Sequence, residues 1–184
     1  LSNCSTDLEM NGGSQIQNIT AINSSTINLS SINYNSCTPG YCFAEFKSYL
    51  DVYVNETNGS AVSGATVNAT NAQSTVVVST TTGSTGYITR QNITFANQTG
   101  NSTPANSRST TYWDNHSVLA YKAGYVSNTT SVNMSANQNV TITLTPFAAC
   151  GDLAGSAVLG SNLSAAGSSC IRITASNVAL DCNG

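Results

Sequence analysis

Charged side chains are scarce in this chain of 184 residues: they make up 7% of it, against about 25% in ordinary soluble domains. The five basic residues stand singly along the sequence, and the formal net charge is −3. A nucleic-acid partner requires clustered Lys and Arg to neutralise its phosphates, so we expect none here. Mixed charges also normally keep proteins apart in solution, so this surface needs another source of hydration.

Long apolar runs are absent as well. No stretch reaches the roughly eighteen apolar residues of a membrane-spanning helix, so the sequence predicts no transmembrane segment. A basic stretch followed by an apolar one, the pattern of a secretory leader, is missing from the given sequence. If the protein is secreted, we therefore expect the given chain to be a mature form or a fragment.

Titratable groups that could build an active site are few, with one His and eight acidic residues. No Ser-His-Asp or Cys-His arrangement is recognisable around His116. Asp114 is close to it in sequence, but both belong to a loop that carries a glycan acceptor, where we expect a solvated turn. Calcium at Asp51 or Asp152 has no Asp-rich loop to support it. We therefore expect no catalytic, cofactor-binding or metal site, and no enzyme activity.

The pattern Asn-x-Ser/Thr, by contrast, is abundant. It is the acceptor for N-linked glycans in exposed segments. With 23 Asn, 27 Ser and 24 Thr, random order would produce about six such patterns, and the chain has fifteen. A chain that is merely rich in Asn and Thr is the alternative explanation. We expect covalent N-linked glycans, no other cofactor and an extracellular or cell-surface location, where sugars would hydrate an uncharged surface. The acceptors are Asn3, Asn18, Asn23, Asn28, Asn55, Asn58, Asn68, Asn92, Asn97, Asn101, Asn115, Asn128, Asn133, Asn139 and Asn162.

The six cysteines form an even set, which indicates disulfides in an oxidising compartment. Zinc is the rival interpretation, but the chain has no Cys-x2-Cys pair. Cys37 and Cys42 flank the turn-forming residues Thr-Pro-Gly-Tyr, so they are expected to pair. The other pairings stay open, because six cysteines allow many connectivities. Our expected pairs are Cys37–Cys42, Cys150–Cys170 and Cys4–Cys182, the last within one chain or between neighbouring chains.

The sequence predicts an all-β fold. No segment shows the 3.6-residue apolar period of a helix, and short alternating runs are separated by Gly, Asn and Ser clusters. Three segments differ in texture. We expect β-helix-like rungs with a disulfide turn in residues 1–47, a β-sandwich domain in residues 48–146, and a β-helix cap with an opening rung in residues 147–184.

Residues 14–36 carry isolated Ile and Leu residues every two to five positions, with Asn and Ser between them. That texture resembles the rungs of a right-handed parallel β-helix, a solenoid in which short strands face an aliphatic core and polar residues form the corners. An irregular β-meander is the alternative.

Three strands of the sandwich can be placed by alternation. Their apolar residues would point inward, and the acceptors Asn68, Asn133 and Asn139 would then point to solvent, as a bulky sugar requires. The inward-pointing residues are expected to be Ala65, Val67, Ala69, Val132, Met134, Val140, Ile142 and Leu144.

Three motifs of residues 48–146 resemble the carboxypeptidase-regulatory-like (transthyretin-like) family of β-sandwiches. They are Gly-x-x-Val-x-Gly-Ala-x-Val at 59–67, Gly-Tyr at 86–87 and Lys-x-Gly-Tyr at 122–125. The resemblance covers about half of the chain and implies a non-catalytic spacer or adhesive module. The stretch from Asn92 to Asn115, with four acceptors and a proline, departs from the family's compact loop, and a glycosylated loop is the simplest account of it.

Residues 147–184 are similar to the opening turn of NosD-like parallel β-helix proteins. In the stretch CGDLAGSAVLGSNLSAAGSSCIRITASNVALDCNG, a Cys-rich cap leads into a strand, a Ser176–Asn177 corner and a second strand. The resemblance implies that the aliphatic side chains on either side of the corner face a core. They are Ile171, Ile173, Val178 and Leu180.

A single coil of a β-helix cannot bury its own core, so the ends of the chain predict a partner. Either the chain is a window of a longer protein, or the C-terminal coil stacks on the N-terminal rungs of another copy and forms a head-to-tail filament. The function we expect is a structural subunit of a glycosylated filament, sheath or surface layer, resembling archaeal surface glycoproteins. A secreted eukaryotic protein is the second possibility for the source. A surface adhesin or carbohydrate-binding module, with Tyr112, Trp113 and Tyr121 as a stacking platform, is the alternative function. Those three aromatic residues are otherwise expected in the sandwich core.

Overall fold

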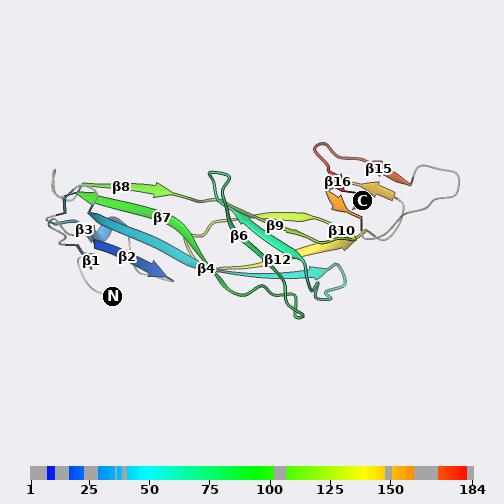
Figure 1. Cartoon of the computed structure of the whole chain (residues 1–184), viewed down its shortest axis with the longest axis horizontal. Helices are drawn as coiled ribbons and strands as arrows, with labels where there is room; N and C mark the ends of the chain where they lie inside the picture. Colours follow the sequence, from blue (N-terminus) through cyan, green and yellow to red (C-terminus); the bar gives the residue numbers. More distant parts are fainter. Residues whose placement is uncertain are drawn as a thin grey trace. The chain divides into compact units, whose positions relative to one another are not determined.

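The computed structural model describes residues 8–10, 17–22, 29–35, 37–38, 41–101, 107–147, 151–159 and 170–181. Figure 1 shows that strands make up nearly all of its regular structure. The described residues contain no α-helix and one short 3-10 helix, η1 (Leu29–Ser31), so the all-β prediction is confirmed. The strands are β1 (Leu8–Glu9), β2 (Gln17–Ile22), β3 (Ile32–Asn33), β4 (Cys42–Glu56), β5 (Thr66–Thr70), β6 (Val76–Thr81), β7 (Gln91–Asn101), β8 (Ser107–Tyr112), β9 (His116–Tyr121), β10 (Tyr125–Val126), β11 (Asn128–Val132), β12 (Gln138–Pro146), β13 (Gly151–Leu153), β14 (Ala157–Val158), β15 (Ile171–Ile173) and β16 (Leu180–Asp181).

The chain divides into two compact units, and neither unit is continuous in sequence. Unit 1 comprises Leu1–Leu50, Gln91–Asn115 and Asn133–Gln138, and unit 2 comprises Asp51–Arg90, His116–Val132 and Asn139–Gly184. Strand β4 contributes to both units and runs through residues 47 and 48, where we expected a domain boundary. The three-segment division stays a prediction.

Unit 1 is built on the first part of β4. Strand β7 pairs with it in antiparallel fashion, β8 continues the sheet, and β2 pairs with β4 in parallel from Gln17–Cys42 to Ile22–Lys47. Strands β1 and β3 also pair in parallel, with Leu8 opposite Ile32. The paired positions lie 24 and 25 residues apart in sequence, a spacing found between successive coils of a solenoid. The solenoid itself stays a prediction.

The core of unit 1 contains a polar network around Gln98, which is 1% exposed. Its amide oxygen accepts a hydrogen bond from the Tyr34 hydroxyl at 2.8 Å, and its nitrogen donates to the Leu29 carbonyl at 3.1 Å and to the Thr110 hydroxyl at 2.8 Å. Arg108 donates to the carbonyl oxygens of Leu29 and Ser30 in η1. These bonds satisfy buried polar groups and attach the η1 segment to the β7–β8 hairpin.

Unit 2 is a two-sheet sandwich. One sheet has the order β11-β9-β5-β6, and the last residues of β4 join β12, β10, β14 and β16 in the other. The inward-pointing residues that alternation predicted are buried, apart from Val140, which is half-buried. Met134 is buried as expected but belongs to unit 1. The β-sandwich prediction is therefore confirmed.

One turn of unit 2 explains a glycine of the Gly-Tyr motif. Gly86 has a φ of 79°, and a Cβ atom there would lie 2.7 Å from the carbonyl oxygen of Val54. Only glycine fits such a left-handed position in close contact with a strand. The Gly86 carbonyl accepts from the Val54 N–H at 2.9 Å, which ties the turn to β4.

Candidate functional site

The acceptor asparagines are the largest group of candidate functional residues. Ten of the fifteen have described side chains, and none of those ten is buried. The six exposed ones are Asn58, Asn92, Asn115, Asn128, Asn133 and Asn139. The four half-buried ones are Asn55, Asn68, Asn97 and Asn101. Asn18 lies in β2, and Asn3, Asn23, Asn28 and Asn162 lie outside the described residues. Every acceptor whose side chain is described therefore reaches the surface at least in part.

Asn71, which is not an acceptor, shows the contrast. It is only 9% exposed, and its amide oxygen accepts from the backbone N–H groups of Gln73 at 3.1 Å and Thr75 at 2.9 Å. An Asn side chain that folds back in this way stabilises a turn. Asn71 therefore differs from the described acceptors in its burial.

Two exposed acceptors lie in turns that include their own serine. The Asn58 amide oxygen accepts from the Ser60 N–H at 2.8 Å, and the Asn133 amide oxygen accepts from the Ser135 N–H at 2.9 Å. In both cases the serine is the third residue of the acceptor pattern. The turn holds the amide oxygen, so the nitrogen that carries a sugar lies on the other branch of the planar amide.

Two half-buried acceptors have more restricted surroundings. The Asn68 amide oxygen is buried and has no hydrogen-bond partner within the described part of the chain. Asn97 fits best with its oxygen accepting from Trp113 Nε1 at 3.3 Å and its nitrogen donating to the Ala96 carbonyl at 3.0 Å. A glycosylated amide keeps one N–H, so the bond to Ala96 is compatible with a sugar on Asn97.

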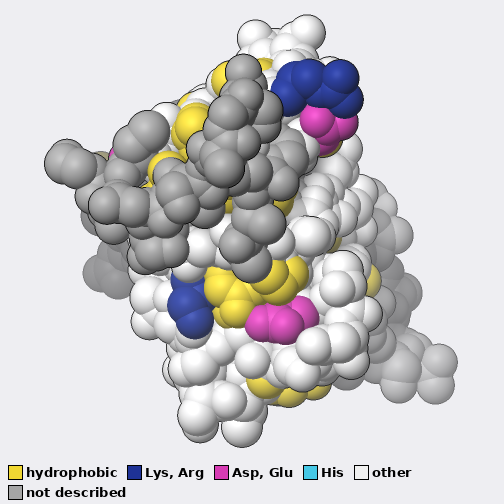
Figure 2. Space-filling view, turned by 90° about the vertical axis from the view of Figure 1, so that its right-hand side faces the viewer, with side chains coloured by type: hydrophobic (Ala, Val, Ile, Leu, Met, Phe, Trp, Pro, Cys, Tyr) yellow, Lys and Arg dark blue, Asp and Glu magenta, His cyan; other side chains and the backbone are white. Residues whose placement is uncertain are grey.

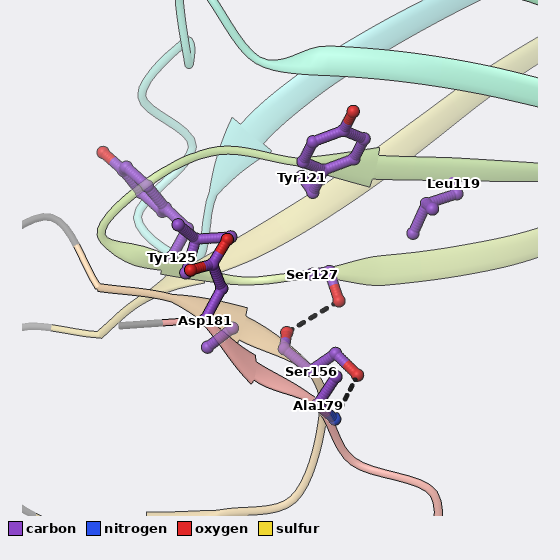
Figure 3. A pocket seen from close by; sticks show the side chains of 9 residues that line it. Leu119, Tyr121, Tyr125, Ser127, Ser156, Ala179 and Asp181 are labelled. Carbon is purple, nitrogen blue, oxygen red and sulfur yellow. Dashed lines mark hydrogen bonds between the residues drawn. The ribbon is translucent and has the colours of Figure 1, made fainter. Parts of the chain in front are cut away.

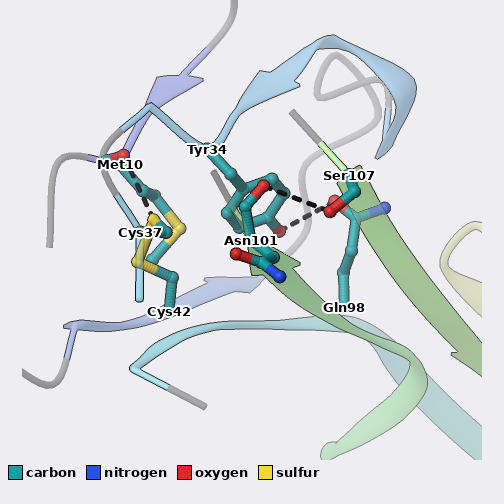
Figure 4. The surroundings of a disulfide bond; sticks show 7 residues. All are labelled: Met10, Tyr34, Cys37, Cys42, Gln98, Asn101 and Ser107. Carbon is teal, nitrogen blue, oxygen red and sulfur yellow. Dashed lines mark hydrogen bonds between the residues drawn. A yellow bond between two sulfur atoms is a disulfide. The ribbon is translucent and has the colours of Figure 1, made fainter. Parts of the chain in front are cut away.

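The Cys37–Cys42 disulfide is confirmed. Both residues are buried in unit 1, and the Cys37 sulfur lies 3.3 Å from the Met10 carbonyl oxygen (Figure 4). Cys170 is also disulfide-bonded, with a partner outside the described residues. Cys4, Cys150 and Cys182 all lie outside the described residues, so the pairs Cys150–Cys170 and Cys4–Cys182 stay predictions.

Asp51 and Asp152 both form ion pairs with arginine. Asp51 lies 2.7 Å from Arg90 Nη2, and Asp152 lies 2.6 Å from Arg172 Nη2. The hydrogen bonds from Arg172 lower the pKa of Asp152 below its usual value. Within the described residues, no group of three or more His, Cys, Asp or Glu side chains could hold a metal ion.

The expectation of a solvated turn at His116 is wrong. This residue is the first of β9, its exposed fraction is 0%, and it pairs with Val132 of β11. The sequence context of a glycan acceptor suggested exposure, but alternation along β9 turns His116 inward with Val118 and Ala120. Asp114 accepts a hydrogen bond from the Met134 N–H at 2.9 Å, a structural use of its carboxylate.

An apolar pocket of about 190 Å³ lies within unit 2. Tyr121 and Leu119 come from β9, Tyr125 from β10, and Ala179 and Asp181 from the C-terminal segment (Figure 3). Hydrogen bonds connect the segments that line the pocket. Ser127 Oγ donates to the Ser156 carbonyl at 2.7 Å, and Ser156 Oγ accepts from the Ala179 N–H at 2.9 Å. The pocket has room for one ring-sized group.

None of the three aromatic residues proposed as a stacking platform is fully buried. Tyr112 is 60% exposed, and Trp113 and Tyr121 are half-buried. Tyr112 and Trp113 belong to unit 1, whereas Tyr121 belongs to unit 2. The expectation that they fill the sandwich core is therefore wrong, because each lies on a strand or loop face that is partly open to solvent.

The sequence did not point to the stacked aromatic pair Tyr53–Tyr87. Their ring centroids are 4.7 Å apart with an interplanar angle of 29°, and Tyr87 is 53% exposed. Alternation along β4 would have placed Tyr53 on the outer face, but the pairing with Tyr87 depends on a bridge between residues 34 positions apart. No local pattern reports such a contact.

The C-terminal strands pair in parallel. Gly151 lies opposite Ile171, and Ala157 lies opposite Leu180, so paired positions are 20 and 23 residues apart. Asn177 has a φ of 57°, which suits the expected corner. Leu153 is completely buried, but Ile173, its partner in β15, is 55% exposed. The prediction that Ile173 faces a core is therefore wrong for a single copy of the chain. Within the described residues, this side chain stays open to solvent.

Charged side chains are few among the described ones on the face that Figure 2 shows, where uncharged polar groups and backbone dominate. Among the described residues, no helix has the length and apolar character needed to cross a membrane. Both findings agree with the composition.

Comparison with known proteins identifies no family. No family model matches the chain, and no curated protein matches it. Among solved structures, it is similar to the Bacillus anthracis TIE protein, at 14% sequence identity and a TM-score of 0.34. The match covers 56% of this chain and 18% of that one. A likeness of this degree carries no functional argument.

Proposed function

We propose that this chain is a structural subunit of a heavily N-glycosylated filament, sheath or surface layer outside the cell. The observation that carries the proposal is the placement of the acceptors: ten side chains are described, and none is buried. A folded protein that uses its acceptors must present them in this way, because an attached sugar is bulky and hydrophilic. Archaeal origin stays a prediction based on acceptor density.

Sugar would also solve the problem of the uncharged surface. Only 7% of the residues are charged, so electrostatic repulsion between molecules is weak. Glycans on both units would supply hydration and steric repulsion instead. The buried Cys37–Cys42 disulfide supports an oxidising compartment, in which such glycans are also attached.

The engagement of acidic side chains supports a non-catalytic role. Glu45 pairs with Lys47 at 3.1 Å, Asp51 with Arg90, and Asp152 with Arg172. Glu56 accepts from the Tyr125 hydroxyl at 2.6 Å, and this bond raises the pKa of Tyr125. These contacts give the carboxylates structural partners, which favours a non-catalytic role.

We further propose head-to-tail assembly through the parallel strand pairs near the two ends of the chain. In the described residues, β15 pairs only with β13 and β16 only with β14, and β1 and β2 likewise pair on one edge. Parallel strands have a direction, so β15 would pair with β1 or β2 of another copy in one orientation only, which favours a head-to-tail contact. The exposed Ile173 would then be covered by the next coil.

Glycosylation and assembly are tested separately. Glycopeptide mass spectrometry of native material should find sugars at the exposed acceptors, and electron micrographs should show filaments or ordered layers.

Two variants test the assembly contact. Ile173→Asp should abolish assembly and leave the monomer folded, whereas the exposed Val76→Asp should leave assembly intact. Discrete monomers at all concentrations would refute assembly, even if the sugars are present. A ladder on non-reducing gels that collapses with reductant would indicate a Cys4–Cys182 crosslink between copies.

A carbohydrate-binding role is the second candidate, and the pocket beside Tyr121 favours it. Two tyrosines and Asp181 surround a space for one ring, and aromatic faces together with a hydrogen-bond acceptor suit a pyranose. Glycan-array binding that is lost in Tyr121→Ala and kept in the exposed Tyr112→Ala would support this function. Loss in Tyr112→Ala or Trp113→Ala alone would instead place the platform in unit 1.

A further inference from the structure

The outer face of β4 in unit 2 brings an acceptor next to an aromatic pair. Val52 and Val54 of β4 are buried, so Asp51, Tyr53 and Asn55 alternate to the opposite face. Tyr53 and Asn55 are two residues apart on this face, which separates them by about 7 Å along the strand. An attached sugar on Asn55 therefore starts close to the Tyr53 ring.

The aromatic pair is held in a fixed position. Tyr53 and Tyr87 form an antiparallel bridge, flanked by hydrogen bonds from Val54 N–H to the Gly86 carbonyl at 2.9 Å and from Ile88 N–H to the Val52 carbonyl at 3.1 Å. The Tyr53 hydroxyl donates to the Gly59 carbonyl at 3.2 Å. The rings stack with centroids 4.7 Å apart, and Tyr87 remains 53% exposed. The pair thus presents an apolar ring surface to solvent.

A hydrogen bond to the neighbouring strand holds the Asn55 side chain on this face. Its amide oxygen accepts a hydrogen bond from the Thr143 hydroxyl of β12 at 2.8 Å. Strand β12 lies along one edge of β4, and the segments that contain Ala61 and Tyr87 bridge to the other edge. Oxygen and nitrogen occupy different branches of a planar amide, so the bond to Thr143 holds the oxygen and leaves Nδ2 as the atom that carries the sugar.

We propose that the Tyr53–Tyr87 pair is a stacking surface for the first sugars of a glycan on Asn55. The C–H face of a pyranose is apolar, and packing it on an exposed aromatic ring removes both from water. The adjacent Asp51–Arg90 ion pair, with Arg90 Nε at 2.9 Å and Nη2 at 2.7 Å from the carboxylate, offers charged groups to the sugar hydroxyls. This inference rests on the proposed glycosylation and assigns one glycan a fixed position on the protein.

A double-mutant cycle in glycosylated protein from the native host tests it. Thr57→Ala removes the acceptor pattern of Asn55 but keeps the Asn55 side chain and its bond to Thr143. We expect Thr57→Ala to lower the melting temperature by about 3 °C in the wild type and by less than about 1 °C in Tyr87→Ala. The matched control is Thr141→Ala, which removes the Asn139 acceptor and should have the same effect with or without Tyr87.

A direct measurement accompanies the cycle. Stacking on an aromatic ring moves sugar proton resonances to higher field, so the innermost sugar of the Asn55 glycan should show such shifts, and Tyr87→Ala should abolish them. If Thr57→Ala lowers the melting temperature equally with and without Tyr87, and the sugar proton resonances are unshifted, the inference is overturned. So would native glycopeptides that carry sugar at the exposed acceptors but not at Asn55. Glycopeptides without sugar anywhere would overturn the proposed function as well.

A binding experiment distinguishes a sugar attached to Asn55 from a saccharide that comes from outside the chain. Oligosaccharide released from the protein should bind to Thr57→Ala, whose aromatic surface is open, and not to the wild type. If it binds equally to the glycosylated wild type, the surface serves a saccharide from outside the chain, and the assignment to the Asn55 glycan is wrong.

Discussion

Gly100 offers the sharpest test of how unit 1 is held together. It lies in β7, next to the acceptor Asn101, and the ring of the fully buried Tyr34 packs directly over it. A Cβ atom at Gly100 would lie 1.8 Å from Cδ1 and 1.9 Å from Cγ of Tyr34. Small movements cannot relieve such an overlap, so Gly100→Ala must displace the tyrosine ring.

The cost follows from what Tyr34 loses. Removing a buried aromatic side chain typically costs about 3–5 kcal/mol. The hydroxyl of Tyr34 also leaves the amide oxygen of Gln98, a buried bond of 2.8 Å whose loss costs about 1–3 kcal/mol. Part of the apolar contact can re-form elsewhere, so we expect a loss of about 4 kcal/mol. For a chain of this size that is a fall of about 10 °C in melting temperature.

Thermal unfolding of Gly100→Ala against the wild type measures the effect, and hydrogen exchange over residues 29–35 locates it. Gly83→Ala is the matched control, because its Cβ would have its nearest contact at 3.7 Å, from the Tyr87 carbonyl oxygen. We expect that control to change stability by less than about 1 kcal/mol. In a Tyr34→Ala background, Gly100→Ala should cost little. Equal stability of Gly100→Ala and the wild type would refute the packing of Tyr34 on β7.

Three further predictions concern Tyr34, the Cys37–Cys42 disulfide and Asn71. Burial raises the pKa of Tyr34 from 10.0 to about 12, against the opposing effect of Arg108, so the unfolded state ionises first. The contribution of the neutral Tyr34 hydroxyl to the free energy of unfolding is therefore complete below about pH 10 and is lost as the pH rises to about 12. When the free energy of unfolding is measured against pH, Tyr34→Phe should remove this fall between about pH 10 and 12. Replacing both Cys37 and Cys42 by Ser should cost about 2 kcal/mol in urea unfolding, and an unchanged midpoint would contradict the disulfide's role. Asn71→Ala should cost about 1–2 kcal/mol, since two backbone N–H groups lose their acceptor, whereas Asn71→Asp should retain most of that stability.

Local alternation predicted much of the sandwich. The apolar residues of β5 and most of those of β12 are buried because a strand exposes alternate side chains to opposite faces, and nothing beyond the neighbouring residues is needed to see it. The Cys37–Cys42 pair was equally local, since five residues and a turn separate the cysteines. For the same reason the acceptor Asn139 is exposed, whereas Asn68, in an inner strand of its sheet, is half-buried.

Contacts between distant residues could not be predicted in this way. The stacking of Tyr53 on Tyr87 and the burial of Tyr34 over Gly100 depend on which strands become neighbours. His116 was misjudged because its acceptor neighbour Asn115 is exposed, although adjacent residues at the start of a strand point to opposite faces. The passage of β4 through both units also has no local signal, because its alternation continues unchanged through residues 47 and 48.

The central claim is that sugar on outward-facing asparagines hydrates this nearly uncharged β-protein. Glycopeptide mass spectrometry of native material, read acceptor by acceptor across this chain, tests it most directly. We predict sugar at the six exposed acceptors, which are Asn58, Asn92, Asn115, Asn128, Asn133 and Asn139. Unmodified asparagine at all six, in protein that stays soluble, would contradict the claim.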